Sequence, residues 1–78
     1  MTLSRLTSDS SAEALIAYAI LDWLIDDGLV DAYNLDIEGD GSCLIEVFTT
    51  SGRFIEQHSV LGPIEAATDV AFQLVNPQ

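Results

Sequence analysis

The pattern of apolar and polar positions predicts a helix over residues 10–28. Ser10 and Glu13 have the spacing of a capping box, in which the serine hydroxyl accepts from the Glu13 amide and the carboxylate accepts from the Ser10 amide. Alanine residues favour the helical backbone, and Gly28 can adopt the left-handed conformation that ends a helix. Both ends of the predicted helix are therefore marked in the sequence.

Apolar residues lie on two sides of this predicted helix. One stripe is Ala14, Tyr18, Leu21 and Ile25, and the other is Ile16, Ile20, Trp23 and Leu24. A surface helix normally carries a single apolar stripe that faces the core. Because so short a chain cannot cover both stripes equally, either its own sheet and second helix enclose this helix or another molecule covers one stripe.

Three β-like stretches follow a turn that includes the sequence LVDAY. Residues 33–38 alternate between apolar and polar positions, which predicts a strand with one buried face. Residues 42–50 are apolar on both faces and predict a central strand. Residues 53–60 have the mixed pattern of a more exposed strand.

Glycine-containing turns separate these stretches. The pair Asp40-Gly41 predicts a hairpin, because both residues tolerate a positive φ, and residues 50–52 predict a second turn. Gly62 and Pro63 begin a second helix, since proline at the first helical position loses no useful backbone donor. The predicted apolar face of this helix consists of Ile64, Ala67, Ala71, Leu74 and Val75.

The predicted fold is a single small α+β domain with elements in the order α-β-β-β-α. Its three strands form an antiparallel meander, and both helices pack on one face of that sheet. Residues 10–78 make up the domain, and residues 1–9 are predicted to be a flexible N-terminal arm.

The predicted order of elements is similar to that of double-stranded RNA-binding domains, but the charge of the chain is opposite to theirs. The sequence has 13 acidic residues against two arginines and no lysine, for a net charge of −11. Those domains contact phosphates and 2′-hydroxyls with a set of basic residues, and this chain has only its two arginines to offer for such contacts. Direct binding to nucleic acid is therefore disfavoured, and a neutral or basic protein surface is the expected partner.

A cytoplasmic location is expected from two features. Cys43 is the only cysteine, so no internal disulfide can form, and the amino terminus lacks the pattern of a signal peptide. The uninterrupted apolar run over residues 14–21 is too short to cross a membrane. Cys43 lies in an apolar strand and is predicted to be a core residue.

No catalytic group, cofactor or metal site is predicted. His58 is the only histidine, and Glu56 beside it on the same strand face does not complete a catalytic set. Asp36, Glu38 and Asp40 have the spacing of the first half of a calcium loop, but the twelfth position, which should be an acid, is Val47. We therefore predict a hairpin turn with acidic flanks, and a calcium- or ligand-responsive module is the alternative.

Acidic residues surround Trp23 at the carboxyl end of the first predicted helix. Acids at this end oppose the helix dipole, and Asp22 and Asp26 repel each other at a spacing of four. Local stability does not explain them. They either solvate an apolar helix or form a partner-binding surface, which would consist of Trp23, Asp22, Asp26, Asp27, Ile16 and Ile20.

These observations favour a small acidic protein-binding module without catalytic activity that is homodimeric. A specific version is an inhibitor, such as a phage-encoded one, that masks the basic nucleic-acid-binding surface of a partner protein. A structural subunit of a larger complex is a further alternative. The acidity could also reflect solubility or a salty cell.

Overall fold

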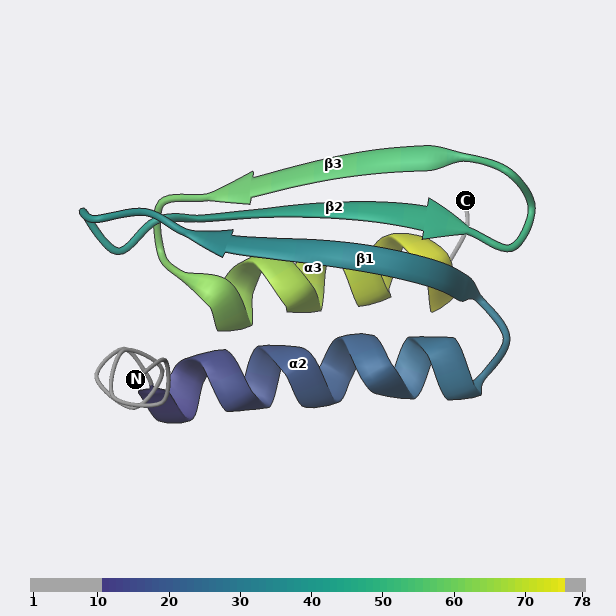
Figure 1. The fold of residues 1–78 in the computed structure, drawn as a ribbon, viewed down its shortest axis with the longest axis horizontal. Helices are drawn as coiled ribbons and strands as arrows, with labels where there is room; N and C mark the ends of the chain where they lie inside the picture. Colours follow the sequence, from purple (N-terminus) through teal and green to yellow (C-terminus); the bar gives the residue numbers. More distant parts are fainter. Residues whose placement is uncertain (1–10, 76–78) are drawn as a thin grey trace, which may run out of the picture.

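The computed structural model describes residues 11–75, which form a sheet layer and a helix layer (Figure 1). Within these residues the elements are α2 (Ser11–Asp26), β1 (Val30–Ile37), β2 (Cys43–Thr49), β3 (Phe54–Ser59) and α3 (Pro63–Val75). This is the predicted α+β order, and the prediction is confirmed. The predicted N-terminal arm over residues 1–9 and the capping serine, Ser10, lie outside the described residues.

The sheet is an antiparallel meander in which β2 lies between β1 and β3. Both helices pack on one face of this sheet, with α2 against β1 and α3 against β2 and β3. Three antiparallel strands leave the chain at the end of the sheet opposite to the one where it entered, which is the end where α2 begins. As a result, α3 runs in the same direction as α2 (Figure 1).

The β1–β2 hairpin confirms the turn predicted at Asp40-Gly41. The Glu38 amide donates to the Ser42 carbonyl at 2.8 Å, and the Gly41 amide donates to the Glu38 carbonyl at 3.0 Å. Gly41 has a φ of 93°, which glycine adopts without the strain that a side chain would cause. The β2–β3 turn repeats this geometry, with Gly52 at a φ of 92° in the place of Gly41.

Gly28 ends α2 as predicted. It has a φ of 80°, and its amide donates to the Ile25 carbonyl at 3.0 Å. The Leu29 amide donates to the Leu24 carbonyl, also at 3.0 Å. These two hydrogen bonds form a Schellman motif, which satisfies the last carbonyls of the helix and reverses the chain within a few residues.

The prediction of a turn between Gly28 and Tyr33 is wrong, because β1 already begins at Val30. Val30 is paired with Thr49, while Ala32 is paired with Phe48, so Asp31 is an extra residue in a β-bulge. The bulge interrupts the alternation of buried and exposed positions. Apolar and polar residues therefore do not alternate in the first half of β1, and this alternation is the pattern that identifies a strand in a sequence.

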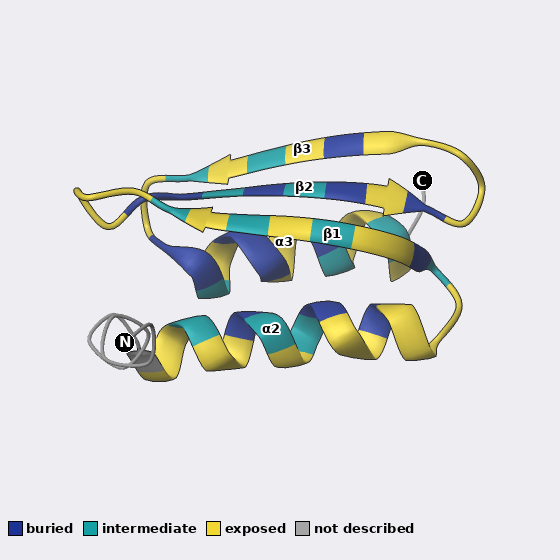
Figure 2. Ribbon diagram, in the orientation of Figure 1, coloured by how far each residue is buried: buried dark blue, intermediate teal, exposed yellow. Residues whose placement is uncertain are grey.

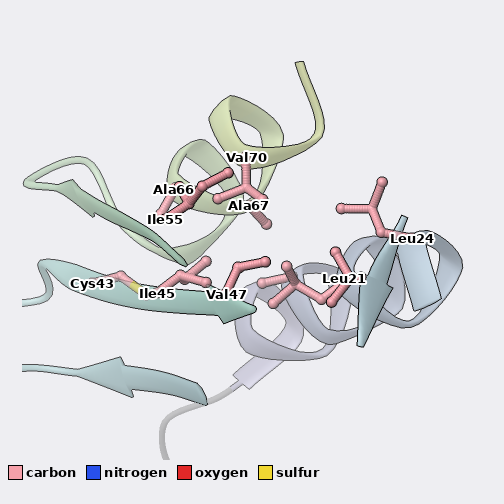
Figure 3. Close-up of a cluster of buried hydrophobic side chains, with 11 residues drawn as sticks. Leu21, Leu24, Cys43, Ile45, Val47, Ile55, Ala66, Ala67 and Val70 are labelled. Atoms are coloured by element: carbon pink, nitrogen blue, oxygen red, sulfur yellow. The ribbon is translucent and has the colours of Figure 1, made fainter. Parts of the chain in front are cut away.

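The core lies between the two layers (Figures 2 and 3). From α2 it receives Ala17, Leu21 and Leu24, which we call the α2 seam. From the sheet it receives Val30, Cys43, Ile45, Val47 and Ile55, and from α3 it receives Ala66, Ala67 and Val70. The α2 seam takes one residue from each predicted stripe, Leu21 and Leu24, so neither stripe as a whole faces the core.

The core face of α3 is also displaced from the predicted one. Ala66 and Val70 are buried, whereas Val75, which was predicted on the core face, is 47% exposed. The small side chains of Ala66 and Ala67 suit the place where α3 packs against both α2 and the sheet. None of the helices in residues 11–75 has both the length and the hydropathy needed to cross a bilayer.

Candidate functional site

The side of α2 that faces away from the core carries apolar side chains along its length. Five residues at spacings of three and four form this surface, which we call the outer α2 face: Ala12, Leu15, Ile16, Ala19 and Trp23. All five are exposed, and the large ones, Leu15, Ile16 and Trp23, are 70%, 47% and 49% exposed. The side of α2 opposite the sheet is accordingly exposed over most of its length in Figure 2.

The structure places two of the predicted apolar site residues together and separates the third. Ile16 and Trp23 are seven residues apart and share the outer α2 face. Ile20 is partly buried and packs against the core. Because Ile20 lies at the border of the α2 seam, only part of its side chain is available to contact a partner.

The predicted acidic residues are exposed at the carboxyl end of α2, but they do not all face the same way. The Tyr33 hydroxyl of β1 donates a hydrogen bond of 2.8 Å to Asp22 Oδ1. This bond directs Asp22 toward the sheet edge. Asp26, the last residue of α2, and Asp27, in the turn that follows, are both exposed. The acids therefore flank the end of the outer α2 face on more than one side.

Tyr33 connects this acidic end to the sheet. Partial burial raises the pKa of its phenol well above the ordinary value of 10.0, and the hydrogen bond to Asp22 raises it further. The Tyr18 ring of α2 lies 6.2 Å from the Tyr33 ring, centroid to centroid. The edge of the α2–β1 contact thus consists of two tyrosines and one carboxylate, and Tyr33 keeps its proton.

The face of the sheet opposite the helices is a second exposed surface, as expected when both helices pack on one face, but the sequence did not reveal the aromatic pair on it. Phe48 and Phe54 form a tilted aromatic pair on it, with ring centroids 5.0 Å apart. Apolar positions on both faces of residues 42–50 predicted a central strand, and β2 is central in the sheet. The pattern did not indicate that Phe48 is exposed, because both helices pack on the other face of β2.

The same sheet face carries acidic residues. Glu46 and Glu56 are directly opposite each other in the β2–β3 register, and the Asn34 side-chain amide donates to Glu46 at 3.3 Å. Asp36 also lies on this face, in the β1 position opposite Leu44. These residues, together with Phe48 and Phe54, define the outer sheet face.

The acidic turn between β1 and β2 is held by hydrogen bonds within the chain. Asp40 Oδ1 accepts from the Ser42 amide at 3.0 Å and from the Ser42 hydroxyl at 2.8 Å. These donors favour the ionised carboxylate and hold the pKa of Asp40 below its usual range. Among residues 11–75, no group of three or more His, Cys, Asp or Glu side chains is arranged to hold a metal ion.

The two side chains best suited to nucleophilic or acid–base chemistry lie on opposite faces of the sheet. Cys43 is buried in the core, as predicted, and burial raises the pKa of its thiol to about 11. His58 is exposed on the outer sheet face, beside Leu44 in the β2–β3 register. The sheet therefore separates the thiol from the imidazole.

Comparison with protein-family models, with curated proteins and with solved structures found no match for this chain.

Proposed function

We propose that this chain is a small acidic protein-binding module without catalytic activity, which associates with protein through the outer α2 face. The observation that carries the proposal is the exposure of Leu15, Ile16 and Trp23 on one side of one helix. Contiguous exposed apolar surface of this kind marks sites of protein association. Tryptophan is also the residue type that most often anchors such contacts.

The charge of the module selects its partners. Asp26 and Asp27 lie beside the outer α2 face, and Asp36, Glu46 and Glu56 lie on the outer sheet face. With a net charge of −11, the chain repels acidic surfaces and attracts basic ones. In its specific form, the proposal is an inhibitor whose acidic surface covers the basic nucleic-acid-binding surface of a partner protein.

Binding to a basic partner of this kind weakens steeply as salt rises, because salt screens attraction between exposed charges. Equal affinity at low and high salt contradicts the inhibitor form of the proposal.

The absence of catalysis is supported by the positions of Cys43 and His58. A nucleophile needs a base within hydrogen-bond reach, and the sheet lies between these two side chains. Burial also keeps the Cys43 thiol protonated at neutral pH, which suppresses its reactivity.

The proposal is tested by the size of the tagged chain in an extract of its source cell, measured by size-exclusion chromatography. The wild-type chain is expected to elute larger than a single chain. Trp23→Ala is expected to elute as a single chain, since loss of an anchoring tryptophan costs about 2 kcal/mol or more, about a 30-fold loss of affinity.

Phe72→Ala is the matched control, because Phe72 is an aromatic residue 67% exposed on the other helix. It is expected to elute with the wild type, and circular dichroism of both variants checks that they are folded. Elution of the wild type as a single chain contradicts the proposal. An equal shift in Trp23→Ala and Phe72→Ala also contradicts it.

A further inference from the structure

We infer that the occupant of the outer α2 face is a second copy of this chain, with the two α2 helices antiparallel and Ala19 at the two-fold axis. This inference rests on the proposed function, because it names the partner of the same surface. The spacing of large and small side chains along the face, and the position of the acids, both lead to this arrangement.

The outer α2 face contains both halves of a helix–helix contact. Ala12, Leu15, Ile16 and Ala19 have the spacing of the four residues that form a hole in knobs-into-holes packing. Alanine at both ends leaves this hole open for a large side chain. Trp23, the large residue outside the hole, is the corresponding knob.

Two-fold symmetry brings the knob to the hole. In an antiparallel pair centred on Ala19, residues equally far before and after Ala19 lie at the same height. Leu15 is four residues before Ala19 and Trp23 is four residues after it. Trp23 of each chain therefore reaches the hole around Leu15 of the other, and the small Ala19 side chains let the helices approach at the crossing point.

The distribution of acids favours the antiparallel direction. Asp22 and Asp26 lie in the carboxyl-terminal half of α2, and Asp27 follows directly. Glu13, in the first turn of α2, lies beside the β3–α3 turn: its Oε1 is 3.6 Å from where a Cβ on Gly62 would be. The amino-terminal half of the outer α2 face is thus free of acids among the described residues.

An antiparallel pair places the acids of one chain near the acid-free half of the other, where the helix dipole is positive. A parallel pair would bring the same acids together and cost energy at every contact. Because one face supplies the knob, the hole and the complementary charge distribution, a second copy fits it without any other protein. The outer sheet faces remain open in this dimer and can meet a basic partner.

Cysteine cross-linking of the purified chain tests this arrangement. Ala19→Cys is expected to form a disulfide-linked dimer on mild oxidation, because the two copies of position 19 meet at the axis. Ala12→Cys alone and Asp26→Cys alone are expected to form no disulfide-linked dimer, whereas their mixture cross-links, since these positions are seven residues on either side of Ala19. Cys43 is buried and is present in every variant, so the wild-type chain measures the background level of cross-linking.

Thr68→Cys, at an exposed position of α3, measures cross-linking by random collision. The Ala19→Cys chain is expected to cross-link about tenfold faster or more, because neighbouring thiols in a dimer have a millimolar effective concentration. Rates equal to that of Thr68→Cys for every variant overturn the inference. Faster linking of Ala12→Cys alone than of the mixture indicates parallel helices and overturns it as well.

The failure of this inference can be told apart from the failure of the proposed function. If the cysteine variants link only by collision while the wild-type chain still elutes as a Trp23-dependent complex in the extract, another protein occupies the face. The dimer is then wrong and the binding module stands. If the wild-type chain elutes as a single chain in the extract and the cysteine variants link only by collision, the dimer and the proposed function are both wrong.

Discussion

Tyr33 joins the two layers of the molecule at their edge through one side-chain hydrogen bond. Its hydroxyl donates to Asp22 on α2, and its ring packs partly against the core. Burial and this hydrogen bond both favour the neutral phenol, so the folded state resists losing the proton. Asp22, which the sequence suggested as a partner-binding residue, thus also contributes to the contact between α2 and β1.

The raised pKa of Tyr33 predicts a loss of stability in alkaline solution. The unfolded chain loses the phenolic proton near the ordinary pKa of 10.0, whereas the folded chain keeps it to higher pH. The stabilisation is therefore complete below about pH 10, and it is lost progressively as the pH rises from there towards the raised pKa of the folded chain. Urea unfolding at about pH 8 and about pH 11 measures this loss.

Tyr33→Phe is the control for this prediction, because it removes the titrating group and keeps the ring. Its free energy of unfolding should fall less between the two pH values than that of the wild type. An equally steep fall in both proteins would show that Tyr33 is not responsible.

At the scale of elements, α2 carries two apolar faces with different tasks. The α2 seam is fully buried against β1 and α3, while the outer α2 face points away from both. Leu24 and Leu15 are the same residue type in the same helix, yet they are 0% and 70% exposed. The seam holds the fold together, and the outer face is free to associate.

This contrast predicts different costs for the same substitution. Leu24→Ala should lower the free energy of unfolding by about 2–5 kcal/mol, because it removes buried atoms and leaves a cavity. Leu15→Ala should change it by no more than about 0.5 kcal/mol when measured at a protein concentration low enough to keep chains apart. Denaturant unfolding followed by circular dichroism gives both values. Similar losses in the two variants would contradict the assignment of the two faces.

Alternation and turn residues were sufficient to predict which elements form and in what order. Gly28, Gly41 and Pro63 mark ends that the structure confirms, because each signal depends on local backbone geometry. The start of β1 was missed because the bulge at Asp31 breaks the period of two. A bulge depends on pairing with a neighbouring strand, so a local sequence pattern cannot predict it.

Which apolar residues are covered could not be predicted, because this depends on contacts between distant segments. Apolar residues on both sides of α2 gave no sign that Leu24 faces the core while Trp23 does not. Phe48 and Phe54 likewise alternate as buried strand residues do, and they are exposed because both helices lie across the other sheet face. The sequence left open whether the chain itself or another molecule covers the stripe that contains Ile16 and Trp23, and the structure leaves these two residues exposed while it buries Leu24 of the same stripe.

At the scale of the whole molecule, the chain combines an excess of apolar residues with an excess of negative charge. Hydrophobic residues make up 49% of the sequence, but its helices and sheet enclose a core on only one face of each. In the dimer that we propose, association through the outer α2 face covers part of the remainder, and the acids favour contact of the rest with water. Two chains of charge −11 repel each other, so salt is expected to strengthen the dimer, whereas it weakens binding to a basic partner.

The fluorescence of Trp23 measures association through this face most directly, because Trp23 is the only tryptophan and is 49% exposed in the single chain. On concentration of the purified protein, its emission is expected to shift to shorter wavelength and to become protected from acrylamide quenching. Added salt is expected to move this transition to lower protein concentration. Emission and quenching that stay those of an exposed indole at every protein and salt concentration would contradict burial of Trp23 against a second copy.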